Sequence, residues 1–196
     1  MDEKAALNFF FELGMLRRNK REGWRVCGVE APESIADHSL RAAQIGYVLA
    51  LLEGYPKPEE VAAALVFHEI GECRVGDAHS ISKMYGRLDE GKAAENQLSP
   101  LGKEGRKIMS LWKLAEHNNA VGGVIAKDAD WLECAITARE YMDAGHAGAE
   151  EWIVSVERAV RTKSAKKLVA ALRKSSPKSW WLRLQKEWRQ AAFPKK

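Results

Sequence analysis

The segment 58-PEEVAAALVFHEIGECRVGD-77 decides the fold. Its apolar residues recur at helical spacing, and its opening proline and glutamates suit the first turn of a helix. His68 and Glu72 continue the row of Val61 and Leu65, so the pattern places an imidazole and a carboxylate on the buried face. Burial of such groups is costly unless each has a partner. A divalent cation would satisfy both groups; the alternative is a hydrogen-bonded core histidine beside solvated glutamates.

A second inward histidine lies near one end of the preceding predicted helix, in 34-SIADHSLRAAQIGYVLALLEG-54. Ser34 followed three residues later by Asp37 has the form of a capping box, which opens a helix. His38 then falls on the apolar stripe of this helix. A single buried histidine is usually only hydrogen-bonded. Two helices that each present one indicate a shared polar site.

Two aspartates interrupt the apolar segment 120-AVGGVIAKDADWLECAITAREYMD-143, which is also predicted to be a helix. Periodicity favours Asp128 over Asp130 as the more buried of the two, because Asp128 continues the row that contains Ile125 and Leu132. Further helices are expected over 3–18, 89–98, 103–118 and, as two pieces, 148–173. Alternating strand patterns are missing, so the predicted fold is all-α.

The cysteines and the N-terminal segment indicate a cytoplasmic protein. Cys27, Cys73 and Cys134 are odd in number and far apart, which argues against a disulfide framework and a structural zinc knuckle. The N-terminal segment resembles neither a secretory signal nor a membrane span, and no GxGxxG, Walker or GxSxG motif occurs. We therefore expect no membrane partner, dinucleotide binding, P-loop chemistry or serine hydrolysis.

The charge of the chain is divided unevenly. Residues 161–196 carry 12 Lys/Arg and one acid, whereas residues 1–160 carry 19 Lys/Arg and 26 acids. We therefore separate a domain over 1–160 from a basic, tryptophan-containing helical extension over 161–196. A basic tail can attract nucleic acid, but a solvated lysine-rich face is the commoner cause of such a run. The tryptophans of the extension are expected to pack on the domain or on a second subunit.

The three segments 32-PESIADHSLRAA-43, 64-ALVFHEIGECRVGD-77 and 125-IAKDADWLECAITAREY-141 together resemble the HD-domain superfamily of metal-dependent phosphohydrolases. Within it they look like the 5′-deoxynucleotidase branch, which includes the HD-domain-containing protein 2 group. The resemblance covers roughly residues 7–145. It implies a single-domain helical bundle, one divalent metal ion, a nucleoside 5′-monophosphate substrate and a homodimer.

The resemblance also implies residue roles. His38, His68, Glu69 and Asp130 would hold the metal, because the family's ligand aspartate stands in a K-x-x-D-x-L pattern that matches 127–132. Asp128 remains the alternative from periodicity. Glu72 would orient or deprotonate the attacking water, and Asp77 would lie near the leaving oxygen and the sugar. The family's R-x-x-R-x-G-W segment matches 18–24, so Arg18 or Arg21 would contact phosphate and Trp24 the nucleotide.

One position departs from the family pattern: the name-giving His-Asp pair is here His68-Glu69. The carboxylate of glutamate lies one methylene further from the backbone, so it must adopt another rotamer, bind differently or leave the metal. The donor set suits cobalt, manganese, zinc or iron. The expected function is phosphate release from nucleoside 5′-monophosphates. The alternatives are hydrolysis of another nucleotide phosphoester, or nucleotide or nucleic-acid binding with catalysis weakened by Glu69.

Overall fold

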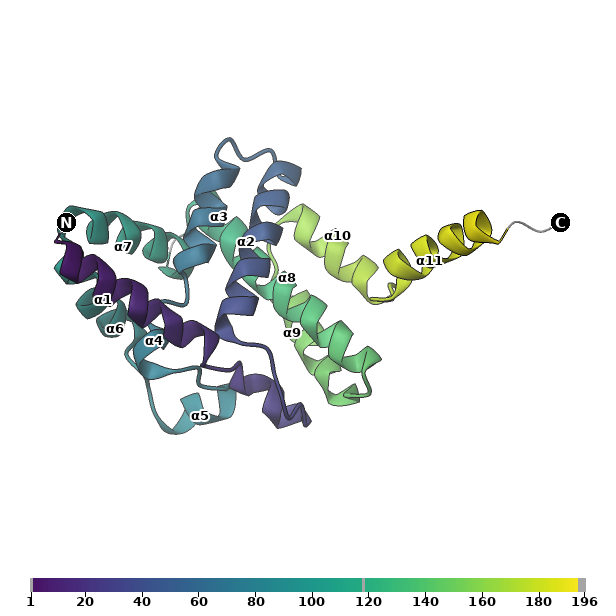
Figure 1. Ribbon diagram of the computed structural model, residues 1–196, viewed down its shortest axis with the longest axis horizontal. Coiled ribbons are helices and arrows are strands. Elements are labelled where there is room, and N and C mark those ends of the chain that lie inside the picture. The colour runs from purple at the N-terminus through teal and green to yellow at the C-terminus, as the bar shows by residue number, and fades with distance from the viewer. Residues whose placement is uncertain (1, 118, 194–196) are drawn as a thin grey trace.

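The regular structure of the computed structural model, which describes residues 2–117 and 119–193, is helical (Figure 1). In this part of the chain no strand forms, and the only β pairing is an isolated bridge between Lys20 and Ser34. The all-α prediction is therefore confirmed. The α-helices are α1 Glu3–Leu13, α2 Ile35–Leu52, α3 Pro58–Phe67, α4 Glu72–Val75, α5 Ser80–Tyr85, α6 Glu90–Leu98, α7 Gly102–His117, α8 Val121–Asp143, α9 Glu150–Ala159, α10 Lys163–Leu172 and α11 Ser179–Ala192.

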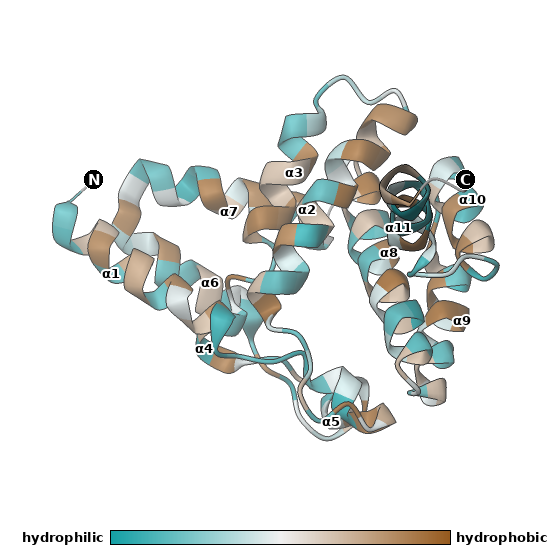
Figure 2. Ribbon diagram, turned by 45° about the vertical axis from the view of Figure 1, so that its right-hand side comes forward, coloured by the Kyte–Doolittle hydropathy of each residue, from teal (hydrophilic) through white to brown (hydrophobic). Residues whose placement is uncertain are grey.

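The core lies where α2, α3 and α8 pack together. A glycine permits the close approach of α2 to α3: a Cβ at Gly46 would lie 2.3 Å from Cδ1 of Leu65 and 3.2 Å from Cγ1 of Val61. Figure 2 shows hydrophobic residues of α3 where this helix meets α2 and α7. Close packing at this crossing brings one end of α2 beside the end of α3 and the middle of α8.

The start of α2 is fixed by the predicted capping box. The Ser34 hydroxyl accepts a hydrogen bond from the Asp37 amide at 3.2 Å, and the Asp37 carboxylate accepts one from the Ser34 amide at 2.9 Å. These bonds satisfy amides that the first turn of a helix leaves free. Because the helix starts here, His38 lies in its first turn and is fully buried.

The deciding segment is not one helix. We predicted that a single helix would carry His68 and Glu72 on one face, but α3 ends at Phe67, His68 caps it, and a turn leads to the separate short helix α4. The turn is packed against the start of α6, since a Cβ at Gly71 would lie 2.6 Å from the carbonyl oxygen of Glu90. This tertiary contact is not visible in the periodicity of the segment.

The packed body continues beyond residue 160, where we placed the domain boundary. Ala165 and Val169 of α10 are fully buried and belong to the same core as α8 and α9. By contrast, α11 buries none of its residues and projects from the body (Figure 1). The extension is thus divided: α10 is part of the bundle and α11 does not pack on the domain. None of the helices described is long and apolar enough to span a membrane.

Candidate metal centre

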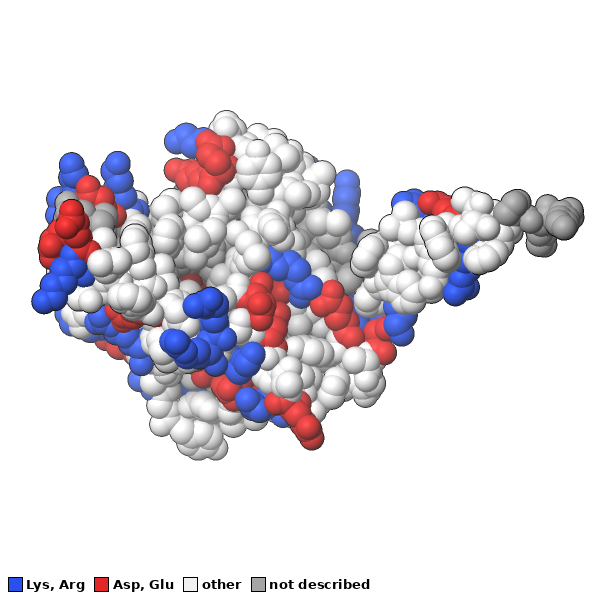
Figure 3. All heavy atoms as spheres, in the orientation of Figure 1, with Lys and Arg blue, Asp and Glu red and all other residues white. Residues whose placement is uncertain are grey.

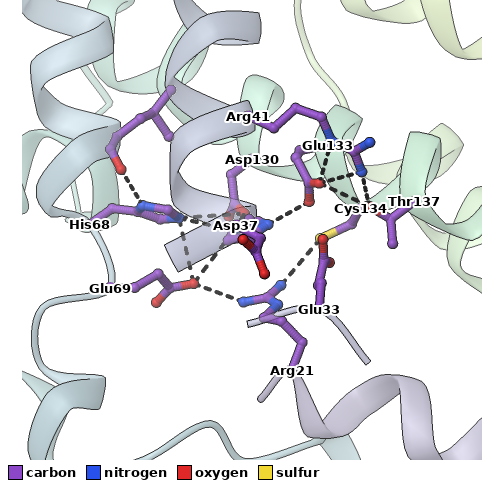
Figure 4. Close-up of polar contacts among 12 residues, drawn as sticks. Arg21, Glu33, Asp37, Arg41, His68, Glu69, Asp130, Glu133, Cys134 and Thr137 are labelled. Atoms are coloured by element: carbon purple, nitrogen blue, oxygen red, sulfur yellow. Dashed lines mark hydrogen bonds and ion pairs between the residues drawn. The ribbon is translucent and has the colours of Figure 1, made fainter. Parts of the chain in front are cut away.

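Four side chains from three parts of the chain converge in the core (Figure 4). His38 comes from α2, His68 and Glu69 from the turn after α3, and Asp130 from α8. The Nε2 atoms of the two histidines are 3.2 Å apart, and Oδ1 of Asp130 lies 3.1 and 3.7 Å from them. Oε1 of Glu69 lies 3.7 Å from Nε2 of His38 and 3.5 Å from Nε2 of His68.

These separations fit a bound divalent cation. Metal bonds of about 2.0–2.1 Å to nitrogen and oxygen place neighbouring ligand atoms roughly 3–3.4 Å apart in tetrahedral or octahedral arrangements. The four ligand atoms lie within 4.8 Å of one another. Two imidazoles and two carboxylates are also the donor set expected for a transition metal with open positions. The structure brings the four predicted ligands together, and Glu69 reaches the cluster despite its extra methylene.

Both histidines are oriented by hydrogen bonds at their other ring nitrogen. Nδ1 of His68 lies 2.6 Å from the carbonyl oxygen of Leu65, which can only accept. Nδ1 of His38 lies 2.5 Å from Oε2 of Glu133. Such partners fix the tautomer and direct the Nε2 lone pair of each ring at a metal.

Glu133 is the site residue that sequence reasoning missed. It is fully buried in α8, one turn after Asp130, and its second oxygen accepts from Nη2 of Arg41 at 2.7 Å and from the Thr137 hydroxyl at 2.8 Å. Its spacing of three residues from Asp130 places both carboxylates on one face of a helix. That spacing was the available signal, but the pairing with His38 requires the α2–α8 contact.

Replacing this partner should weaken metal binding. We expect Glu133→Gln to lower metal affinity about 10–100-fold, because a neutral amide orients His38 poorly and polarises it less. Glu140→Gln is the matched control, since Glu140 also binds Arg41, at 2.8 Å, but contacts neither histidine. Titration against a competing chelator measures the metal affinity of both variants. Equal affinities in the two variants would show that Glu133 does not position His38.

The charges of the cluster suit a cation. Burial opposes ionisation of Asp130, but the Lys127 ammonium, 2.9 Å away, and the two histidines outweigh it and hold the pKa of Asp130 well below its usual range. Burial likewise opposes ionisation of Glu69, but His68 and Arg21 lower its pKa. The pKa of His38 is lowered by burial and Arg21, yet Asp130 and Glu133 raise it to about 9. A metal bound by His38 would compete with a proton for the ring nitrogen.

A cavity of 490 Å³ opens over the cluster, and both predicted catalytic acids lie in its wall. Glu72 is only 3% exposed, and its Oε2 finds no hydrogen-bond partner within the residues described. Burial, reinforced by Glu69 and Asp77, raises the pKa of Glu72 to about 9. Oδ2 of Asp77 accepts a hydrogen bond of 2.6 Å from the Glu22 amide, which fixes that side chain at the rim.

Of the three predicted substrate contacts, only Arg21 enters the charged part of the cavity. Its Nη1 donates to Oε1 of Glu69 at 2.9 Å and its Nη2 lies 3.3 Å from Sγ of Cys134. Arg18 is exposed and does not line the cavity. Trp24 is a wall residue whose ring is covered by Tyr141 and Trp152, at centroid distances of 5.2 and 4.9 Å. Stacking of a base on Trp24 is therefore not supported by its packing.

The alternative ligand Asp128 has a structural role. Periodicity was right that it is buried, but its carboxylate accepts from the Arg161 amide at 3.0 Å and from the Thr162 amide at 2.7 Å. It therefore holds the start of α10, whereas Asp130 faces the histidines. Other residues in the wall of the cavity are Glu116, Lys127, Trp131, Trp152 and Ser155.

Comparisons with known proteins agree with this arrangement. The model of the HD domain family matches residues 13–172. The 5′-deoxynucleotidase HDDC2 of Dictyostelium discoideum is 32% identical over 151 residues, which cover 71% of this chain and 79% of that protein. The human 5′-deoxynucleotidase HDDC2 is 32% identical over 147 residues, covering 73% and 71% of the two chains.

A solved structure shares the fold of most of this chain. The crystal structure of the structural-genomics target APC5600 superposes with a TM-score of 0.77 at 32% identity, and the match covers 91% of this chain and 99% of the other. The family match spans the packed body from the end of α1 to the end of α10 and includes every ligand of the cluster. This chain belongs to the HD domain family.

Proposed function

We propose that the chain is a metal-dependent phosphohydrolase that releases phosphate from nucleoside 5′-monophosphates, with preference for the 2′-deoxy form. The observation that carries the proposal is the cluster of two histidines and two acids at the base of a cavity that also holds Arg21 and the buried Glu72. The relatives named 5′-deoxynucleotidase support the substrate class. Cobalt, manganese, zinc and iron are the metals that we propose for this nitrogen and oxygen donor set.

We propose a separate role for each group of side chains in the cavity. His38, His68, Glu69 and Asp130 would hold the metal, which when bound polarises phosphoryl oxygens and lowers the pKa of water. We propose that Arg21 holds phosphoryl oxygens, because its guanidinium faces the cluster and offers donors in a planar fork. Binding of phosphate would exchange its contact with Glu69 for contacts with the substrate.

Glu72 is the proposed proton acceptor. Its pKa of about 9 reflects burial beside other carboxylates. A cation held by the cluster would lower this pKa, because positive charge nearby favours the ionised form of a carboxyl group. That change brings the group toward the operating pH, where a general base is most effective. Asp77 lies across the same wall, and we propose that it contacts the leaving oxygen or the sugar.

The test is phosphate release from a panel of ribo- and deoxyribonucleoside 5′-monophosphates by chelator-stripped protein, with and without added cobalt or manganese. Release that returns only with metal and favours 5′-monophosphates is the expected result. Absence of release with every metal, from protein shown to be folded and metal-loaded, would contradict the proposal. Release from triphosphates or cyclic nucleotides alone would assign another substrate class.

Shortening the acid beside His68 should preserve the site. We expect Glu69→Asp to keep metal affinity within about tenfold and to preserve or raise turnover, because it frees Arg21 for the phosphate. Glu69→Gln, which keeps the length and removes the charge, should weaken metal binding. Chelator competition and phosphate release on the same preparations check both. Loss of metal in Glu69→Asp alone would show that the site requires glutamate.

We also propose a cytoplasmic location and a homodimer. Cys27, Cys73 and Cys134 are all free thiols, which is usual in a reducing compartment. The exposed apolar face of α11 supports self-association.

A further inference from the structure

One face of α8 forms a wall of the cavity over the metal cluster. The lining residues that this helix supplies are Lys127, Asp130, Trp131 and Cys134. Their spacing of three, four and seven residues from Lys127 places all four on the same side of the helix, over about 10 Å along its axis. Asp130 therefore stands near the middle of this row, with Lys127 one turn before it and Cys134 one turn after it.

A cation lies at each end of this row. Nζ of Lys127 lies 2.9 Å from Oδ2 of Asp130, whereas Oδ1 of the same carboxylate faces the histidines. At the other end Nη2 of Arg21 lies 3.3 Å from Sγ of Cys134, and Figure 4 shows this guanidinium between Cys134 and Glu69. Lys127 and Arg21 thus flank the proposed metal ligands from two sides.

Metal binding alone does not account for the ammonium of Lys127. A positive charge this close to a metal ligand repels a second cation, so by itself it weakens the affinity of the cluster for metal. Among the described residues, Lys127 donates one hydrogen bond, to Asp130, although an ammonium has three donors. Its side chain is 35% exposed and lines the cavity, so donors remain for a bound molecule.

The rest of the cavity is unfavourable for an anion. Seven acidic and three basic residues line it. Figure 3 shows that, on the face drawn, Lys and Arg are interspersed with Asp and Glu over the body rather than gathered into one basic surface. Glu116 shares the wall with Lys127, but the two form no ion pair within the part of the chain described, and burial raises the pKa of Glu116. An anionic substrate must therefore be held by the few cations beside the cluster.

The formal charges at the cluster match a phosphate monoester. The carboxylates of Glu69 and Asp130 balance a divalent metal ion, and Arg21 and Lys127 add two positive charges. A phosphate monoester is largely a dianion at neutral pH, because its second pKa is about 6, whereas a diester carries one negative charge. A monoester therefore completes the charge balance of the site, and a diester leaves one cation unpaired.

We propose that Lys127 contacts the phosphate of the substrate directly and, with Arg21, holds it beside the metal cluster from two sides, which favours phosphate monoesters over diesters. This inference rests on the proposed phosphohydrolase function and adds a substrate-contacting residue to it. The alternative is that Lys127 only supports Asp130. That role would affect metal affinity, whereas the proposed role affects the affinity for phosphate.

The test measures binding to protein loaded with cobalt or manganese, by isothermal titration calorimetry. The probes are inorganic phosphate, mostly a dianion at about pH 8, and dimethyl phosphate, which carries one negative charge. Lys127→Gln removes the charge, and Lys127→Arg keeps it. Lys83→Gln is the matched control, because it removes the same charge from the same cavity on a side chain that is 54% exposed and pairs with Glu90. Chelator competition measures the metal affinity of every variant.

Lys127→Gln should lower the affinity for phosphate at saturating metal about 10–100-fold, and it should reduce the preference for phosphate over dimethyl phosphate. Lys127→Arg should bind phosphate more tightly than Lys127→Gln. Lys83→Gln should stay within about threefold of wild type, because an exposed charge is screened. Metal affinity should not fall in Lys127→Gln, since a repelling charge is removed.

Phosphate affinity that Lys127→Gln leaves unchanged would overturn the proposal, whether or not metal affinity falls. Metal-loaded wild-type protein that binds no phosphate would also overturn it. The readout is binding, so it is separate from turnover. Turnover of nucleoside 5′-monophosphates together with an unchanged phosphate affinity in Lys127→Gln would refute this contact and leave the proposed function standing. Phosphate binding that depends on Lys127 without turnover of any nucleotide would do the reverse.

Discussion

Glu72→Gln should abolish phosphate release while making the metal-free protein more stable near neutral pH. Loss of a general base costs about 10²–10⁴-fold in rate. Stability should change in the opposite direction, because the wild-type carboxyl is buried and its Oε2 has no hydrogen-bond partner among the described residues. Glutamine has nearly the same shape and cannot ionise. The variant therefore separates the catalytic use of this group from its structural cost.

The pH dependence of that gain has a definite sign. Folding raises the pKa of Glu72 from 4.5 to about 9, so between these values the native state holds a proton that the unfolded state has lost. The free energy of unfolding must then fall as pH rises through this window. His38, with a raised pKa of about 9, adds a fall above 6.5, but it is present in both proteins. The stability difference between Glu72→Gln and wild type therefore isolates Glu72 and should grow with pH.

Denaturant unfolding of the metal-free proteins at several pH values measures this difference, which we expect to reach on the order of 1–3 kcal/mol. Glu90→Gln is the control. Glu90 lines the same cavity with a carboxylate close to those of Glu69 and Glu72, but it pairs with Lys83 at 3.7 Å and lies outside the metal cluster. It should retain turnover within about tenfold. A catalytically active Glu72→Gln would remove this residue from the mechanism.

The helices of the bundle could be predicted because each is specified by residues that are close together in the sequence. The capping box at Ser34 and the apolar rows of α2 and α8 specify an element without reference to the rest of the chain. The break after Phe67 could not be predicted in this way. The turn that replaces the expected helix is packed against the start of α6 at Gly71, and that contact joins residues remote in sequence.

The residues of the candidate site could also be predicted only in part. Two inward histidines and buried acids could be read from the helical rows, but only resemblance to a known family distinguished Asp130 from Asp128. Some side-chain contacts join α2 to α8, such as His38 with Glu133 and Arg41 with Glu133. No spacing in the sequence predicts these contacts. The substrate contacts were the weakest part. Arg18 and Arg21 look equivalent in sequence, yet the fold brings only Arg21 to the cluster.

Asp130→Asn should remove the metal from a folded protein, whereas Asp128→Asn should destabilise the fold and leave metal binding intact. The two residues are two positions apart on α8 and both are buried, so the pair compares the same chemical change on opposite sides of one helix. Asp130 contributes a charged oxygen 3.1 Å from Nε2 of His38. Loss of a direct ligand should exceed the about 10–100-fold effect of losing a partner of a ligand.

Asp128 makes its contacts with backbone amides instead. Its carboxylate accepts from the amides of Arg161 and Thr162, where the chain enters α10. Hydrogen bonds to a charged group contribute about 1.5–3 kcal/mol, and the neutral amide of asparagine keeps only part of that. Chelator competition measures the metal affinity of both variants, and thermal unfolding measures their stability. The larger loss of metal affinity should occur in Asp130→Asn and the larger loss of stability in Asp128→Asn. If Asp128→Asn lost the metal and Asp130→Asn kept it, Asp128 would be the ligand, as helical periodicity alone suggested.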